Sequence, residues 1–84
     1  MNKAIIADNK VFCSNNHHNY QVKDYKEVSI NNGKYTKFIA RCKECEEIFY
    51  YFSQIRVEED KYFMFDEGQE NEIKEEKEGN KIDE

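Results

Sequence analysis

Three cysteines and two adjacent histidines are the residues of this chain whose types and spacing best suit chemistry. Cys13 is followed by His17 and His18, and Cys42 is followed by Cys45. Thiolate sulfur and imidazole nitrogen are the usual ligands of structural zinc, which takes four of them in a tetrahedron. Two short ligand pairs, each on a tight turn, therefore predict a Cys3His zinc site made by the three cysteines and one histidine.

The sequence leaves two histidines for one coordination position. Three residues separate Cys13 from His17 and four separate it from His18, and both spacings occur in zinc sites. We favour His17 and keep His18 as the alternative. The histidine that does not bind would donate a hydrogen bond near the metal or face solvent. Without a metal, the thiols would pack as small apolar groups.

A complete Cys3His set does not favour catalysis. A catalytic zinc keeps an open position for water, whereas three cysteines and a histidine close the shell. The chain has three glycines, and their spacing matches no phosphate-binding loop. We therefore expect a structural zinc, no enzyme activity and no small-molecule substrate.

The cysteine count also bears on the cellular compartment. Three thiols cannot form a closed disulfide framework, and the first residues lack the apolar core of a signal peptide. No stretch approaches the roughly 20 apolar residues that a membrane span needs. We expect a reducing, cytoplasmic location and no membrane contact, where the thiols remain available to a metal.

The elements that must bring the two ligand pairs together are predicted to be strands. Leucine is absent, and the apolar residues are mainly Ile, Val, Phe and Tyr, which suit β structure. Residues 20–41 have the pattern of a long β-hairpin, with a turn at Asn31-Asn32-Gly33, because Asn and Gly tolerate positive φ. A hairpin between the ligand pairs would place their two turns face to face.

Residues 46–56 fit two secondary structures. Their composition is that of a strand, but Ile48, Phe52 and Ile55 are also spaced as on one face of a helix. We prefer a strand here, followed by a further strand or turn through residues 62–65.

The ligand pattern resembles that of small bacterial and phage zinc-ribbon-like proteins. Residues 12–52, about half the chain, carry a Cys-x3-His or Cys-x4-His element, a hairpin and a Cys-x2-Cys knuckle followed by aromatic residues. The chain departs from the more familiar pattern because its first pair is not Cys-x2-Cys and neither knuckle has a glycine. The resemblance implies a small β-rich zinc ribbon with a structural metal and a binding role. A treble clef of α+β type is the alternative, and it would make residues 44–56 helical.

Charge divides the chain into two parts. Residues 1–56 carry nine Lys or Arg against six Asp or Glu, whereas residues 57–84 carry four against twelve. Apolar residues nearly vanish after Phe65. We therefore predict a zinc-binding domain over residues 1–66 and a disordered acidic tail over residues 67–84.

Two surfaces are candidates for binding a partner. Lys34, Lys37 and Arg41 interleave with Tyr35 and Phe38 on the hairpin, which is a pattern suited to nucleic acid. The low pI of about 5.1 argues against such a role. The other candidate is an aromatic cluster that is either core or protein interface, represented by Tyr50, Tyr51, Tyr62 and Phe63.

The expected function is therefore that of a small zinc-binding protein-interaction module. Lysine outnumbers arginine eleven to two, a bias that suggests an AT-rich bacterial or phage genome. We accordingly expect a phage-type or accessory regulator or inhibitor that docks on a larger host protein. The alternative is a nucleic-acid-binding zinc ribbon that uses the basic face of the hairpin over residues 20–41.

Overall fold

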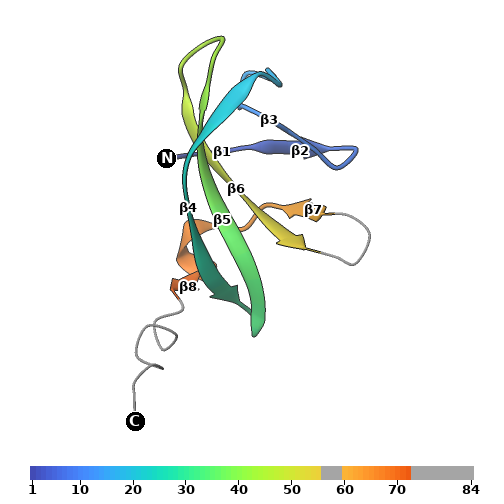
Figure 1. Ribbon diagram of the computed structural model, residues 1–84, viewed down its shortest axis with the longest axis vertical. Helices are drawn as coiled ribbons and strands as arrows, with labels where there is room; N and C mark the ends of the chain where they lie inside the picture. The colour runs from blue at the N-terminus through green and yellow to red at the C-terminus, as the bar shows by residue number, and fades with distance from the viewer. Residues whose placement is uncertain (56–59, 73–84) are drawn as a thin grey trace.

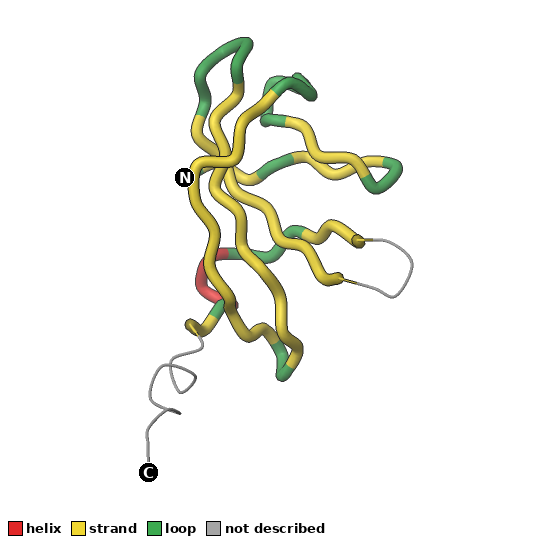
Figure 2. The backbone as a smooth tube through the Cα atoms, in the orientation of Figure 1, coloured by secondary structure: helices red, strands yellow, loops and turns green. Residues whose placement is uncertain are grey.

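The computed structural model describes residues 1–55 and 60–72, and it is almost entirely β structure (Figures 1 and 2). A single turn of 3-10 helix, η1, is the exception in this part of the chain. The elements in chain order are β1 (Asn2–Lys3), β2 (Ile5–Ala7), β3 (Lys10–Phe12), β4 (Tyr20–Ile30), β5 (Gly33–Cys42), β6 (Ile48–Ile55), β7 (Asp60–Phe63), η1 (Glu67–Gln69) and β8 (Asn71–Glu72).

Most strands belong to one mixed sheet. Its order is β1-β6-β5-β4-β8, and β7 pairs with β6 on the same side as β1. β1 is parallel to β6, and the other pairs are antiparallel. β2 and β3 form a separate two-stranded hairpin that lies against the large sheet (Figure 1).

The long hairpin predicted over residues 20–41 is confirmed as β4 and β5. Its turn is made by Asn31 and Asn32, both with positive φ (50° and 68°), and Gly33 already begins β5. Two consecutive positive φ values define the turn whose twist matches that of paired strands. Asp8 and Asn9, with φ of 53° and 57°, make the same kind of turn between β2 and β3.

The strand predicted after the Cys-x2-Cys knuckle is also confirmed. β6 pairs with β5 from Arg41↔Ile48 to Thr36↔Ser53, so within the described residues 44–55 the helix that a treble clef would require is not formed. Phe49, Tyr50, Tyr51 and Phe52 are all buried because β6 is central and both faces of the sheet are covered.

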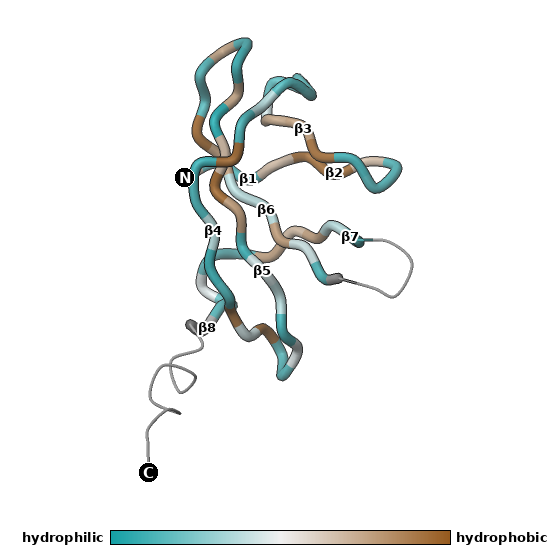
Figure 3. Tube along the Cα trace, viewed as in Figure 1, coloured by the Kyte–Doolittle hydropathy of each residue, from teal (hydrophilic) through white to brown (hydrophobic). Residues whose placement is uncertain are grey.

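Each face of the sheet has its own apolar cluster. On the first face, Ala4, Val11 and Cys13 from the N-terminal segment pack against Ala40, Cys42, Phe49 and Tyr51. On the opposite face, Val28, Ile30, Tyr50 and Phe52 pack with the partly buried side chains of Tyr35, Ile39, Phe63, Met64 and Phe65. The apolar residues are thus concentrated in the central strands, while β4 is largely hydrophilic along its length (Figure 3).

The acidic segment departs from the prediction at its beginning. Residues 67–72 were assigned to a disordered tail, but they form η1 and β8, and β8 pairs with Val28 and Ser29 of β4. Together with Met64 and Phe65 they make a strap, residues 64–72, across the second face of the sheet. Residues 73–84 of the predicted tail lie outside the described part of the chain.

A small, mostly β fold is therefore confirmed. Within residues 1–55 and 60–72, no helix has the length and apolar character needed to cross a membrane.

Candidate metal centre

The first ligand pair lies in the loop that joins β3 to β4. The Asn16 N–H donates to the Cys13 carbonyl (2.8 Å), and the Cys13 N–H donates to the His17 carbonyl (2.9 Å). Asn16 has a φ of 70°, which a short polar residue accepts more readily than most. These two hydrogen bonds close the loop, so the Cys13 thiol and the His17 ring lie on the same side of it.

The second pair lies in the loop that joins β5 to β6. The Glu46 N–H donates to the Cys42 carbonyl (2.9 Å), and the Cys42 N–H donates to the Glu47 carbonyl (2.8 Å). Glu46 reverses the chain with a φ of 66°. The N–H groups of Glu44 and Cys45 point at the Cys42 sulfur at 3.3 and 3.5 Å, so this knuckle can stabilise a thiolate.

Backbone and side-chain contacts hold the two loops together at one end of the molecule (Figure 1). The Lys43 N–H donates to the Asn19 carbonyl at 2.8 Å. The Glu47 carboxylate accepts the N–H of Ser14 at 2.9 Å and is also hydrogen-bonded by the Ser14 hydroxyl and the Asn2 amide. The Ser14 contacts lower the pKa of Glu47, so this carboxylate is ionised where it bridges the loops.

One ligand atom from each of Cys13, His17, Cys42 and Cys45 lies within 4.8 Å of all the others. The Cys13 and Cys45 sulfurs are 3.8 Å apart, and His17 Nδ1 is 3.5 Å from the sulfurs of Cys13 and Cys42. A tetrahedron with metal–sulfur bonds of about 2.3 Å and a metal–nitrogen bond of about 2.0–2.1 Å requires separations of about 3.8 Å and 3.5–3.6 Å. The four residues therefore have the spacing to hold one metal ion.

His17 and His18 differ clearly in their surroundings. His17 belongs to the cluster, whereas His18 Nδ1 is 2.7 Å from the Val11 carbonyl. The His18 ring also contacts the rings of Phe12 (5.1 Å) and Tyr20 (5.9 Å). The structure thus places the preferred histidine among the ligand atoms and gives the other one a packing position.

The three thiols differ in solvent exposure and in pKa. Cys13 and Cys42 are fully buried and Cys45 is exposed, and none of the three is in a disulfide. Hydrogen bonds from the Asn15 side-chain amide and the Glu47 N–H lower the pKa of Cys45 to about 6. Burial raises the pKa of Cys13, whereas at Cys42 the N–H donors outweigh burial and lower the pKa. Contacts with Cys45 and Cys42 raise the pKa of His17.

The structure separates the three residues of the predicted basic surface. Lys37 is buried beneath the strap, with its Nζ 2.7 Å from Glu70 and 3.7 Å from Glu67. Arg41 lies on the same face but pairs with Glu46 at 3.2 Å. Lys34 is an odd number of residues away from both Lys37 and Arg41 on β5, and its side chain therefore lies on the opposite face of the sheet.

The predicted aromatic surface is mostly core. Tyr50 and Tyr51 are 1% and 4% exposed, and Tyr62 and Phe63 of β7 are partly buried. Tyr51 packs between Phe38 (5.2 Å) and Tyr62 (5.7 Å), and burial strongly raises its pKa.

Sequence reasoning missed the residues that support the ligands. Asn15 donates its amide to the Cys45 sulfur at 3.3 Å, and Glu47 joins the two ligand loops. Asn15 and Glu47 lie within two residues of a candidate ligand in the sequence, and this proximity could have identified them. Residues beside metal ligands often supply the hydrogen bonds that orient them.

Comparison with known protein families, with curated proteins and with solved structures found no match to this chain. The resemblance to zinc ribbons therefore rests only on the spacing of the candidate ligands.

Proposed function

We propose that this protein is a zinc-stabilised protein-interaction module of zinc-ribbon-like architecture that acts in the cytosol. Zinc has a structural role in it, and the module serves as a phage-type or accessory regulator by docking on a larger host protein. The observation that carries the proposal is the cluster of Cys13, His17, Cys42 and Cys45, whose ligand atoms lie within 4.8 Å of one another.

The donor set favours zinc over other common ions. Three sulfurs and one imidazole nitrogen suit zinc, whereas calcium and magnesium prefer oxygen. The position of the cluster suits a structural role, because Cys13 and Cys42 are also members of the first apolar cluster. A metal at this point would tie the N-terminal hairpin and the large sheet together.

The surface next to the metal centre is the favoured place for a protein partner. Ile48 is 44% exposed on β6 and Met1 is 55% exposed. Both lie at the same end of the sheet, since the residues that follow them, Phe49 and Asn2, are paired. A shallow cavity of about 200 Å³ lies at the knuckle, lined by Gln21, Arg41, Cys42, Lys43 and Glu46. Apolar side chains with a polar rim are typical of protein interfaces.

Nucleic-acid binding is the weaker candidate. It needs cations that are accessible to phosphate, whereas Lys37 is buried against Glu67 and Glu70 and Arg41 is paired with Glu46. If this candidate were correct, the metal-loaded protein would shift a labelled oligonucleotide at low salt. Replacing Lys34 and Arg41 by Glu would abolish that shift.

The test of the protein-binding role uses two exposed isoleucines of similar accessibility. Ile48 next to the metal centre is 44% exposed, and Ile5 on the β2–β3 hairpin is 41% exposed. The metal-loaded full chain is immobilised and used to capture proteins from a lysate of its source. A partner retained by the wild type and by Ile5→Asp but lost with Ile48→Asp supports the proposal. Equal retention by Ile48→Asp contradicts the assigned surface, and an oligonucleotide shift without any protein partner favours the alternative.

A further inference from the structure

The strands β5 and β6 separate at the end of the sheet that lies away from the metal centre. Their pairing ends at Thr36↔Ser53, although β5 begins at Gly33 and β6 continues to Ile55. Beyond that point β5 stays paired with β4 and β6 with β7, so the two hairpins diverge (Figure 1). A cavity of about 230 Å³, called here the fork cavity, lies where they part. Its lining residues are Glu27, Lys34, Tyr35, Thr36, Ser53 and Gln54.

Three polar side chains line the fork cavity from the face of the sheet that carries the first apolar cluster. Thr36 lies opposite Ser53 on β6 and opposite Glu27 on β4, so the three are neighbours on one face. Tyr51, a member of the first apolar cluster, is two residues before Ser53 and therefore marks the same face.

The other face of the sheet closes the fork cavity. Gln54 spans the gap between the strands, because its side-chain amide donates to the Lys34 carbonyl at 3.3 Å. The Tyr35 ring packs against the ring of Phe63 at 5.4 Å, which joins the two hairpins on that face. The fork cavity therefore opens toward the first face alone.

Ser53 is the most unusual member of this lining. It is 4% exposed, and in the part of the chain that the structure describes its hydroxyl has no hydrogen-bond partner. Buried hydroxyl groups are generally hydrogen-bonded, because burying one without a partner costs free energy. Since Ser53 lines the fork cavity, a ligand there can supply the missing hydrogen bond.

The remaining polar groups of the fork cavity are mostly acceptors. Thr36 donates its hydroxyl to the Glu27 carboxylate at 3.3 Å, so the oxygens of both side chains can accept further hydrogen bonds. The side-chain oxygen of Gln54 is another acceptor, because its nitrogen is the donor to the Lys34 carbonyl. The carboxylate disfavours an anionic ligand, and the Lys34 ammonium disfavours a cationic one. A neutral ligand with several hydroxyl groups can donate to these oxygens and accept from Ser53.

An exposed aromatic side chain lies beside the fork cavity on the same face. Tyr25 is 67% exposed and pairs across the strands with Phe38, two positions along from the pair of Glu27 and Thr36. Two residues of a strand span about 7 Å. The centre of the Tyr25 ring is 6.2 Å from that of Phe38, which supports it from one side. The exposed side of the ring can pack against the apolar C–H groups of a sugar.

We propose that the fork cavity binds a neutral saccharide. One sugar ring enters the cavity and hydrogen-bonds to Ser53, Glu27 and Gln54, and the adjoining ring packs on Tyr25. The volume of about 230 Å³ suits a single ring, because sites for drug-sized ligands span about 300–1,000 Å³. The site goes beyond the proposed function, since it lies at the opposite end of β6 from Ile48 and uses no candidate metal ligand.

The experiment is a nuclear magnetic resonance titration of the isotope-labelled, metal-loaded full chain. The probes are four neutral disaccharides: maltose, cellobiose, lactose and diacetylchitobiose. A disaccharide that fits should shift the backbone amide signals of residues 25–27, 34–36 and 53–54, with a Kd of about 1 mM or below.

Four variants connect these shifts to the fork cavity. Ser53→Ala should raise the Kd about tenfold and also raise the urea midpoint, because the unpaired buried hydroxyl is removed. Glu27→Ala, at an exposed position, and Tyr25→Ala should each weaken binding while the protein stays folded. The control is Ser29→Ala, which alters a half-buried serine on the same face of β4 outside the lining and should leave the Kd unchanged.

Three outcomes would overturn the inference. The first is that none of the four disaccharides shifts these amides at about 100 mM. The second is binding that Ser53→Ala leaves unchanged, and the third is a urea midpoint that Ser53→Ala lowers. A chain that captures a protein through Ile48 but binds no disaccharide contradicts this inference alone, and the reverse result contradicts only the proposed function.

Discussion

His17 and His18 are neighbours in the chain, and their surroundings predict different effects of substitution. His17→Ala removes one of the four proposed ligands, and we expect zinc affinity to fall about 100-fold or more. His18→Ala removes the contact with the Val11 carbonyl and should cost about 1 kcal/mol of stability without changing zinc stoichiometry. Competition with a chromophoric chelator gives the affinities, and urea unfolding gives the stabilities. Equal zinc affinities of the two variants would contradict the assignment of His17.

The thiols should differ in reactivity when the metal is absent. Cys45 is exposed and its pKa is lowered to about 6, whereas Cys13 and Cys42 are buried. Iodoacetamide should therefore modify Cys45 first at neutral pH, because the thiolate is the reactive form. The rate should fall as the pH is lowered through about 6, where the Cys45 thiolate becomes protonated.

Zinc loading provides the control for this reactivity. A bound metal should protect all three cysteines from alkylation, because each thiolate sulfur would be coordinated to it. Peptide mass spectrometry of samples quenched at intervals identifies the modified residue. Modification of Cys13 before Cys45 would contradict the geometry.

At the residue scale, the sequence was sufficient to predict which four residues cluster as candidate ligands. Cys13, Cys42 and Cys45 follow a local spacing rule, whereas spacing allowed both His17 and His18, and only the structure separates these two histidines. The supporting contacts of Asn15 and Glu47 could not be predicted, because each joins residues at least 30 positions apart in the chain.

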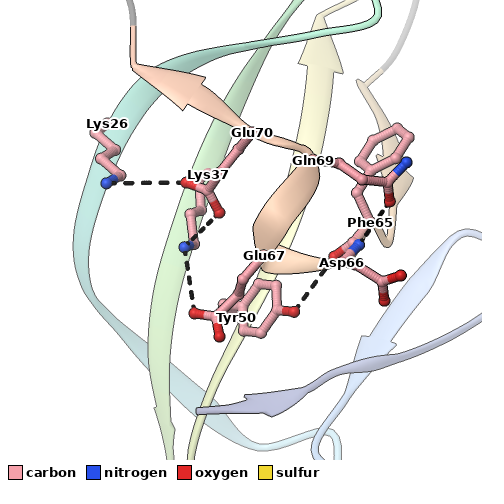
Figure 4. A network of polar contacts seen from close by, with 8 residues as sticks. All are labelled: Lys26, Lys37, Tyr50, Phe65, Asp66, Glu67, Gln69 and Glu70. Carbon is pink, nitrogen blue, oxygen red and sulfur yellow. Dashed lines mark hydrogen bonds and ion pairs between the residues drawn. The ribbon is translucent and has the colours of Figure 1, made fainter.

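At the scale of elements, the strap over the second face is held by ion pairs between its glutamates and the buried ammonium group of Lys37. The Lys37 side chain is 6% exposed, contacts Glu67 and Glu70, and lies 4.8 Å from the centre of the Tyr50 ring (Figure 4). Tyr50 also donates its hydroxyl to the Phe65 carbonyl at 3.3 Å. Within η1, the Asp66 N–H donates to the Gln69 side-chain oxygen at 2.8 Å.

Removing the charge of Glu70 should destabilise the strap. Glu70→Gln leaves Lys37 buried with a weaker set of partners, and we expect a loss of about 2 kcal/mol in the free energy of unfolding, measured with urea. The double variant Lys37→Met/Glu70→Gln removes both charges and should recover part of that loss.

A matched control for the strap is the exposed pair of Lys3 and Asp66. Their side chains are 54% and 69% exposed, so Lys3→Met should barely move the urea midpoint. If Glu70→Gln were as mild as Lys3→Met, the strap would not depend on the buried ion pair.

The hairpin and β6 were predicted correctly because their signals are local. The Asn31-Asn32 turn and the dense run of β-forming residues at 48–52 each lie within a few positions of the elements they define. The strap was missed because its acidic residues resemble a disordered segment until they meet Lys37, and Glu70 lies 33 residues from it in the chain. Composition alone cannot show a partner at that distance.

At the scale of the whole molecule, the candidate metal centre lies where the N-terminal segment meets the large sheet. Its four candidate ligands lie in the β3–β4 loop, at the end of β5 and in the β5–β6 loop, and two of them are core residues. Since metal-binding energy contributes to folding energy, a strong zinc chelator should unfold residues 12–52. Near-ultraviolet circular dichroism and amide hydrogen exchange measure this loss, and re-addition of zinc is the control. Unchanged exchange in the metal-free protein would contradict a structural role for the metal.

X-ray absorption at the zinc edge of the purified full chain tests the central claim most directly. The proposed site predicts one zinc per chain with three sulfur neighbours at about 2.3 Å and one nitrogen neighbour at about 2.0–2.1 Å. The nitrogen contribution should disappear in His17→Ala and persist in His18→Ala. A protein that folds without a bound metal, or a metal surrounded mainly by oxygen and nitrogen, would contradict the Cys13-His17-Cys42-Cys45 site.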